Sequence, residues 1–288
     1  SRFKGGQLAQ HCLAPAPGRQ LISLIISDVL GDPLDVIASG PTAPDPTTFA
    51  DARQILQAKK LWDRAPASAR DYLEAGLSGK HPETPKQAVA EEPRLVHRLA
   101  ASIQQAVHAA ANEAEALGYQ VIEYVDQRDH DTLTLASYFA DQVLSLEQER
   151  PVCLVSGGET TVQLPADAGR GGRNQSFALG FLLHLDALLQ PADAPNDPSS
   201  NDLSWNRRSA WRGITGLFAG TDGEDGPTDT AGAFADAAVL ERARELGLHP
   251  AAALARHDAY PFFDATGALF RTGLTDTNVM DLRVILLP

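Results

Sequence analysis

Two loops of the chain concentrate the residue types that bind anions. The segment SGGETT (156–161) places two glycines and Glu159 directly after an apolar run, and GRGGRNQ (169–175) joins three glycines to Arg170 and Arg173 ahead of a helical pattern. Glycines let backbone N–H groups approach an anion, and guanidinium groups grip phosphate or carboxylate as a fork. GRGGRNQ therefore predicts an anion site at a helix N-terminus. SGGETT fits either an anion site or an ordinary tight turn.

A third loop, GTDGEDGPTDTAG (220–232), is acidic and contains Asp222, Glu224, Asp225 and Asp229. Clustered carboxylates can hold Mg²⁺ through a few direct ligands and water, or can take a proton from a substrate hydroxyl. The spacing does not fit the EF-hand pattern of calcium loops. The alternative is a solvated loop in which the aspartates form turns and cap a helix.

A fourth loop, RTGLTDTNVMD (271–281), is rich in threonine and contains Asn278. Thr275, Thr277 and Asn278 could hydrogen-bond a substrate, or they could cap a turn. Other nucleotide and hydrolase signatures are absent from the sequence: it contains no GxxxxGK[ST], no GxGxxG after a strand and no GxSxG elbow.

The composition excludes several classes of protein. The chain has 288 residues, of which 43% are apolar, so it can bury a sizeable core. Its net charge of −13 argues against nucleic acid or an anionic membrane as a partner, because both require a basic face. The apolar runs are too short to span a bilayer. Two cysteines form neither a disulfide framework nor a metal motif, which favours a cytoplasmic location.

Regular elements must position these loops, and their alternation predicts an α/β fold. Strands are predicted at 21–29, 94–99, 119–125, 151–156, 214–220 and 281–287, and helices at 47–60, 66–77, 101–117, 131–149, 174–189 and 236–246. Ligands bind beyond the carboxyl ends of parallel strands. We therefore expect the loops after Ser27, Ser156 and Ala219 to converge on one edge and line a polar cleft.

Five segments in a fixed order cover nearly the whole chain. They are SDVLGDPLDVIASGPT (27–42), VSGGETTVQL (155–164), GRGGRNQ (169–175), GTDGEDGPTD (220–229) and TGLTDTNVMDL (272–282). Together they resemble the class II glycerate kinase family, whose C-terminal domain is known as MOFRL. Asp276 departs from the pattern, because the family usually has glycine there, and an added carboxylate could alter substrate contacts.

The resemblance implies two three-layer α/β/α domains with the active site between them. The first domain has a parallel sheet and is only partly present, and the second has a mixed sheet. Residues 1–90 are expected to be the C-terminal remainder of the N-terminal kinase domain, and residues 91–288 the C-terminal domain, with the MOFRL region at about 151–284. The incompleteness is inferred from FKGGQLAQ, which resembles an internal segment of the family.

The resemblance also implies phosphorylation of D-glycerate by ATP with Mg²⁺, and typical bacterial members give 2-phosphoglycerate. The expected partners are thus two small molecules, glycerate and ATP, and a homodimer is a further expectation. Two alternatives remain open. One is an oxidoreductase of the hydroxypyruvate reductase type, which the missing dinucleotide fingerprint disfavours. The other is an inactive ligand-binding fragment.

Site residues are assigned by hypothesis on the matching motifs. Arg170 and Arg173 bind the anions, and Lys4 pairs with a phosphate. Asp222 or Asp225 holds Mg²⁺ or accepts the hydroxyl proton. The catalytic set is thus Lys4, Arg173, Asp222 and Asp225, and the residues expected to bind substrate or nucleotide are Asp28, Gly157, Gly158, Glu159, Arg170, Gly171, Gly172, Asn174, Thr275 and Asn278.

Overall fold

The computed structural model describes residues 5–15, 17–86, 92–125, 130–146, 151–189, 211 and 213–288. Contacts divide the chain into two compact units, Ser1–Ile25 with Gly31–Ala100, and Ile26–Leu30 with Ala101–Pro288. The predicted domain boundary after residue 90 stays a prediction. None of the described helices is long and apolar enough to cross a membrane.

The first unit combines a short parallel sheet with small helices. Its elements are α1 (Gln7–Leu13), β1 (Leu21–Ile26), η1 (Ile37–Ser39), α2 (Phe49–Ala58), η2 (Trp62–Arg64), α3 (Ala67–Leu77) and β2 (Leu95–Ala101). Leu21 N–H donates to Arg94 O and Ser27 N–H donates to Ala101 O, both at 2.9 Å. Because the partner number rises along both strands, β1 and β2 are parallel, which confirms the parallel sheet expected for the first domain.

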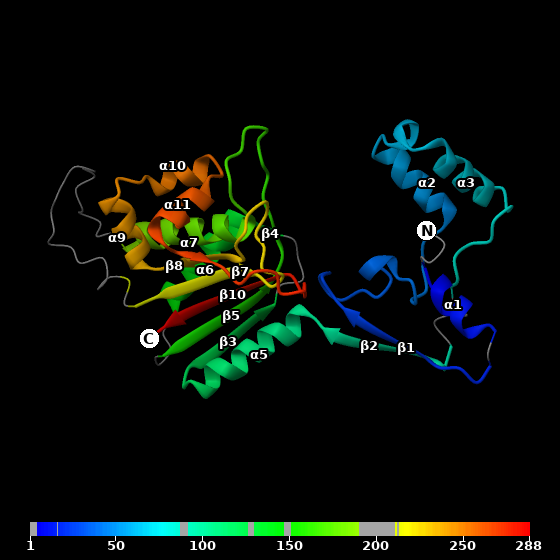
Figure 1. Cartoon of the computed structure of the whole chain (residues 1–288), viewed down its shortest axis with the longest axis horizontal. Coiled ribbons are helices and arrows are strands. Elements are labelled where there is room, and N and C mark those ends of the chain that lie inside the picture. Colours follow the sequence, from blue (N-terminus) through cyan, green and yellow to red (C-terminus); the bar gives the residue numbers. More distant parts are fainter. Residues whose placement is uncertain are drawn as a thin grey trace. The chain divides into compact units, whose positions relative to one another are not determined.

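The second unit contains a six-stranded sheet flanked by helices (Figure 1). Its elements are α5 (Ile103–Ala116), β3 (Gln120–Val125), β4 (His130–Asp131), α6 (Thr132–Ser145), β5 (Val152–Gly158), β6 (Thr160–Thr161), α7 (Arg173–Leu189), β7 (Thr215–Gly220), β8 (Gly232–Ala235), α9 (Ala237–Glu245), α10 (Pro250–Ala255), α11 (Ala259–Thr266), β9 (Leu269–Phe270) and β10 (Asp281–Leu287).

The strand order of this sheet is β3-β5-β10-β7-β8-β9. β3 and β5 are parallel, whereas β10 is antiparallel to both β5 and β7. The predicted mixed sheet is confirmed. The sequence pattern did not predict the short strands β8 and β9, which extend the sheet beyond β7.

The order brings three strand ends to one edge of the sheet. Because β5 and β7 both run antiparallel to β10, their carboxyl ends meet at the edge where β10 begins. The register pairs Asp281, the first residue of β10, with Gly158 of β5 and Gly220 of β7. β1 itself belongs to the separate two-stranded sheet, but the loop after it lies with the second unit, where Leu30 packs against the cluster that contains Met280.

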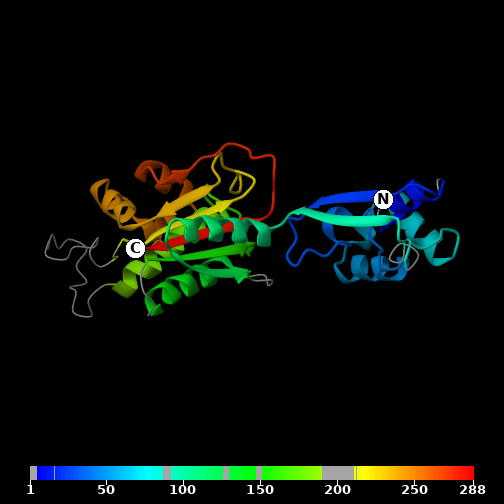
Figure 2. The same cartoon turned by 90° about the horizontal axis from the view of Figure 1, so that it is seen from below.

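Helices cover both faces of the six-stranded sheet, with α5 on one face and α6 and α7 on the other (Figures 1 and 2). Successive side chains of β5 point to opposite faces of the sheet, and this alternation explains the layering. Val152 and Leu154 pack into the cluster of α6 and α7, whereas Cys153 and Val155 pack against α5. A strand with both faces covered reads as a continuous apolar run, which is how this strand appears in the sequence.

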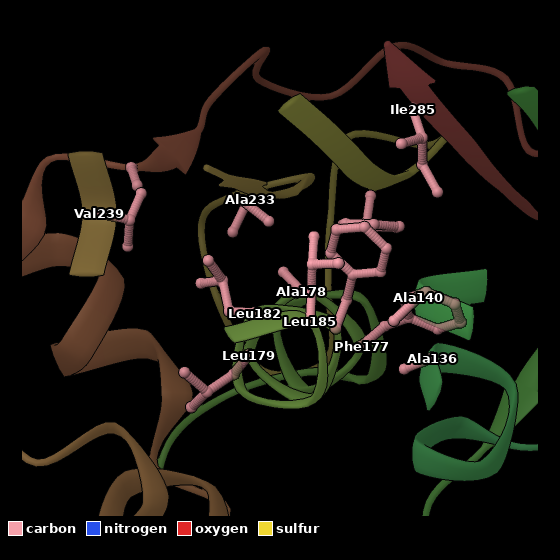
Figure 3. Packing of buried hydrophobic residues seen from close by; sticks show 14 of the residues in the cluster. Ala136, Ala140, Phe177, Ala178, Leu179, Leu182, Leu185, Ala233, Val239 and Ile285 are labelled. Carbon is pink, nitrogen blue, oxygen red and sulfur yellow. The ribbon is translucent and has the colours of Figure 1, made fainter. Parts of the chain in front are cut away.

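Figure 3 shows the larger core, in which α7 is the central element. Phe177, Leu182 and Leu185 are fully buried, and they face residues such as Ala136 of α6 and Ile285 of β10. Each large apolar side chain buried in this way contributes about 1.5–3 kcal/mol. α7 is therefore held firmly, and so is its first residue, Arg173.

Candidate functional site

A cluster of polar side chains lies at the edge where β5 and β7 end, and Arg173 is at its centre. Nε of Arg173 donates to Oδ2 of Asp281 at 2.7 Å, and Nη2 donates to Oδ1 of the same residue at 3.0 Å. Nη1 forms an ion pair with Glu159 at 2.5 Å. Burial by itself would lower the pKa of Arg173, but the bonds and charge of Asp281 raise it above its ordinary value. Arg173 therefore stays charged.

Asp225 occupies the N-terminus of α7. Its Oδ1 accepts the N–H of Asn174 at 2.9 Å, and its Oδ2 accepts the N–H of Gln175 at 2.8 Å. Nδ2 of Asn174 adds a bond of 3.3 Å to Oδ1. A Cβ on Gly172 would lie 2.2 Å from Cγ of Asp225, so only glycine allows this close approach. The anion site predicted at this helix N-terminus is thus filled by the protein's own carboxylate.

The surroundings of Asp225 favour the helix-capping alternative over the predicted roles in metal binding or proton transfer. The residue is buried, with 2% of its surface exposed. Burial raises the pKa of Asp225 to about 6, although the bonds from Asn174 and Gln175 lower it. Both carboxylate oxygens are already committed to donors of α7. A buried carboxylate with two occupied oxygens has little capacity left for a metal ion.

Asp222 is the carboxylate of the acidic loop that is better placed for a ligand. It is partly exposed, and its Oδ1 accepts the N–H of Glu224 at 3.0 Å. Among the described residues, no group of three or more acidic, histidine or cysteine side chains could hold a metal ion. Mg²⁺ bound together with a nucleotide needs only one or two protein carboxylates, because phosphates and water supply the other ligands. Asp222 fits this limited role.

The predicted substrate contacts at Thr275 and Asn278 are engaged in building a turn. Oγ1 of Thr275 donates to Thr221 O at 2.6 Å, and Oδ1 of Asn278 accepts the N–H of Met280 at 2.9 Å. Met280 has φ of 75°, a conformation that is uncommon for a residue with a large side chain. These bonds hold the bend that leads into β10, so the turn-capping alternative accounts for both side chains.

Arg170 lies beside the central cluster. It takes part in a second network, with Tyr260 of α11 and Asp229. Its guanidinium group lies 3.8 Å from the ring centroid of Tyr260 and 3.6 Å from Asp229. The hydroxyl of Tyr260 donates to Asp229 at 2.6 Å. The N–H of Arg170 donates to Oδ1 of Asp258 at 3.0 Å, so the backbone of the GRGGRNQ loop is fixed to the start of α11. About half of the Arg170 side chain remains exposed and can contact an anion.

The remaining predicted residues are divided between the cluster and other places. Gly157 and Gly158 end β5, and Gly171 packs against the first residues of α11. Asp28 is exposed just beyond β1, and none of the contacts seen among the described residues joins it to Arg173. Lys4 lies outside the described residues.

Sequence reasoning missed two charged residues at the start of β10. Asp281 and Arg283 are buried on the same face of the strand, with 0% and 1% of their surfaces exposed. A signal was present in DLRVILL, where two opposite charges two positions apart interrupt an apolar strand. Charged residues are rarely buried unless they are paired, so this spacing indicates an internal ion pair.

Comparison with known proteins matches these features to one family. The MOFRL family model matches residues 152–281, and a second model, a domain of unknown function (DUF4147), matches residues 1–74. A glycerate 2-kinase of Pyrococcus horikoshii is 35% identical over 97% of this chain and 57% of its own length. A glycerate kinase of Macaca fascicularis is 32% identical over the whole chain and 76% of its own length.

Two further comparisons complete the relationship. A protein of Agrobacterium vitis that bears the provisional name hydroxypyruvate reductase is 40% identical over the whole chain and 58% of its own length. The crystal structure of a glycerate kinase from Thermotoga maritima, 29% identical, superposes on the whole chain with a TM-score of 0.77 and is covered to 61%. The chain thus spans about three-fifths of several of these relatives. From its motifs, its fold and these matches, the chain belongs to the glycerate kinase family of class II with a MOFRL domain.

Proposed function

We propose that this chain takes part in the transfer of phosphate from ATP to D-glycerate, with 2-phosphoglycerate as the product. The observation that carries the proposal is the position of Arg173. Its guanidinium group lies at the edge where β5 and β7 end, and about a third of the side chain is exposed. Both substrates are anions, and arginine is well suited to bind carboxylate or phosphate.

Phosphoryl transfer requires positioning and neutralisation of charge more than covalent chemistry by the protein. Arg173 would bind one anionic group through the edge that now faces Glu159, and Arg170 would bind a second one from its stack on Tyr260. Glu159, with 43% of its side chain exposed, can move aside when an anion arrives. Guanidinium groups can stabilise negative charge that develops in a transition state.

The proposed metal is Mg²⁺, which enters with ATP. When it is bound, Mg²⁺ neutralises charge on the phosphates. Asp222 would hold it, because this carboxylate is partly exposed and uses Oδ1 for a single bond within its own loop. The same carboxylate is the candidate for accepting the proton of the glycerate hydroxyl. The cytoplasmic location and the homodimer stay predictions.

A second candidate is an oxidoreductase acting on hydroxypyruvate, because relatives from Agrobacterium vitis bear that name. Such an enzyme needs a nicotinamide cofactor, and the sequence has no GxGxxG after a strand. Phosphoryl transfer is therefore the better-supported proposal.

Two parallel assays on the full chain separate these functions. The first supplies ATP, Mg²⁺ and D-glycerate and follows formation of ADP. The second supplies NADH and hydroxypyruvate and follows loss of NADH absorbance. We expect ADP formation that depends on D-glycerate, and no oxidation of NADH. Addition of enolase identifies the product, because enolase acts on 2-phosphoglycerate and not on the 3-isomer. NADH oxidation without ADP formation would refute the proposal.

A further inference from the structure

Asp281 is placed so that it can touch Arg173 but not a substrate. It is fully buried, and its two oxygens accept three hydrogen bonds, from Nε and Nη2 of Arg173 and from Nδ2 of Asn174. The bonds measure 2.7, 3.0 and 3.0 Å, respectively. A carboxylate that is closed off from solvent and fully bonded can act on chemistry only through its partners.

The backbone around Asp281 fixes the position of its carboxylate. The residues opposite it on both neighbouring strands are glycines, Gly158 and Gly220. A Cβ on Gly220 would lie 2.6 Å from Glu224 O and 2.9 Å from Oδ1 of Asp222, so the acidic loop approaches the end of β7 closely, whereas Oδ1 of Asp281 lies at an ordinary contact distance of 3.7 Å. Met280, in its left-handed conformation, precedes Asp281, and its carbonyl accepts the N–H and Oγ1 of Thr221 at 3.0 and 2.7 Å. The carboxylate is thus fixed from its own strand and the adjoining loop.

Arg283 supplies a second positive charge behind Asp281. Its Nη2 lies 3.9 Å from Oδ2 of Asp281 and donates to Gly158 O at 3.1 Å. Its guanidinium group lies 5.1 Å from the ring centroid of Phe177. The carboxylate therefore lies between two guanidinium groups, one fully buried and one at the edge of the cluster. The two guanidinium groups thus supply the opposite charge that a buried carboxylate requires.

The fork geometry then determines which nitrogen of Arg173 can meet a ligand. Nε and Nη2 donate to Asp281, whereas Nη1 contacts Glu159. The Glu159 side chain is about half exposed, so a substrate anion can take its place beside Nη1. We propose that Asp281, with Arg283 behind it, is a positioning residue that fixes the Nε edge of Arg173 and presents Nη1 to the anionic group of the substrate. This inference rests on the proposed function of Arg173 in binding a substrate anion.

A double-mutant cycle of Arg173→Ala and Asp281→Asn on the full chain tests this role. Asparagine keeps one acceptor but replaces the other oxygen by a donor, which opposes Nε of Arg173. We expect Asp281→Asn alone to lower kcat/KM for D-glycerate about 10–100-fold, in the range of lost transition-state contacts. In the absence of Arg173 the same change should have an effect of less than about threefold, because the two hydrogen bonds through which Asp281 positions Arg173 no longer exist. Independent effects that multiply would overturn the proposal.

Asp258→Asn is the matched control. Asp258 fixes the same GRGGRNQ loop through the N–H of Arg170, yet the described contacts do not include one with the Arg173 side chain. Its effect on kcat/KM should therefore multiply with that of Arg173→Ala. If both aspartates behave alike, Asp281 merely supports the loop, and the positioning role is wrong.

A second measurement does not depend on activity. The ¹⁵N resonance of Nε–H in Arg173 should be shifted and protected from exchange in the wild-type chain, and the Arg173→Lys variant assigns it. We expect Asp281→Asn to abolish this protection. An unprotected Nε–H in the wild-type chain would overturn the proposal. If the resonance behaves as expected but the chain transfers no phosphate from ATP, the proposed function fails while the placement of Arg173 by Asp281 stands.

Discussion

Oδ2 of Asp225 accepts the backbone N–H of Gln175 at 2.8 Å, so the acidic loop caps α7 from 50 residues away in sequence. The carboxylate takes the place that a bound anion would take in many nucleotide-binding proteins. Since Arg173 is the first residue of the same helix, the cap lies close to the arginine that we propose to bind a substrate anion. In the proposed function, ligand anions are therefore bound by the arginine side chains rather than by the N–H groups at the start of α7.

The burial of this capping carboxylate predicts a specific dependence of stability on pH. The pKa of Asp225 is raised from 3.8 to about 6 in the folded chain. The unfolded state therefore binds fewer protons between these values, and the contribution of Asp225 to the free energy of unfolding falls as pH rises from about 4 to about 6. The full effect is on the order of 3 kcal/mol. Asp225→Asn should remove this component, as measured by urea unfolding across the pH range.

The control for that measurement is Asp236→Asn at the N-cap of α9, where Oδ1 accepts the N–H of Val239 at 3.1 Å. Asparagine caps a helix about as well as aspartate, so this variant should keep about the wild-type stability across the pH range. An unchanged slope in Asp225→Asn would show that Asp225 is not the titrating group.

Gly172 is predicted to be intolerant of a side chain. A Cβ at this position would lie 2.2 Å from Cγ of Asp225. This buried carboxylate accepts hydrogen bonds at both oxygens, so it can move aside only by breaking them. Gly172→Ala should lower the free energy of unfolding by about 1–3 kcal/mol, the usual cost of overpacking.

Gly18→Ala is the matched control, because a Cβ at Gly18 meets no atom within 4 Å. Its effect should remain within about 0.5 kcal/mol. Equal stabilities of the two variants would contradict the close approach of Asp225 to the start of α7.

The sequence predicts the local elements of this fold better than their partners. Apolar runs locate β5 and β7, and Gly-rich loops mark where both strands end. Nothing local reveals that β10 enters between these two strands in the opposite direction, because strand order depends on tertiary pairing. The sequence does not predict β8, because the segment GAFA is only four residues long and its two alanines and glycine do not favour a strand.

The same limit applies to the site. Arg173 and Glu159 stand out by residue type and motif, and they do lie in contact. Asp281 does not stand out, because its importance arises from a pairing across 108 residues of sequence. Asp225 also stands out in the sequence, where its carboxylate suggests a metal ligand. Only the position of α7 shows that both of its oxygens accept hydrogen bonds from that helix.

Asp222 is expected to control the response to Mg²⁺. Asp222→Asn keeps the acceptor for the N–H of Glu224 but removes the negative charge that would face the metal. We expect the Mg²⁺ concentration for half-maximal ADP formation to rise at least about tenfold, since a direct carboxylate ligand is lost. Glu224→Gln, two residues further along the same loop, is the control and should leave this concentration within about twofold. The assignment fails if Asp222→Asn shows an unchanged Mg²⁺ response.

The most direct test of the account is the activity of Arg173 variants of the full chain with ATP and D-glycerate. Arg173→Ala should lower kcat/KM by about 10²–10³, the usual effect of removing a charged transition-state contact. Arg173→Lys should also be impaired, because lysine lacks the fork that both Asp281 and a substrate anion require. Circular dichroism must show that both variants remain folded. Loss of activity in folded variants is the predicted result, and near-normal turnover of folded Arg173→Ala would contradict the account.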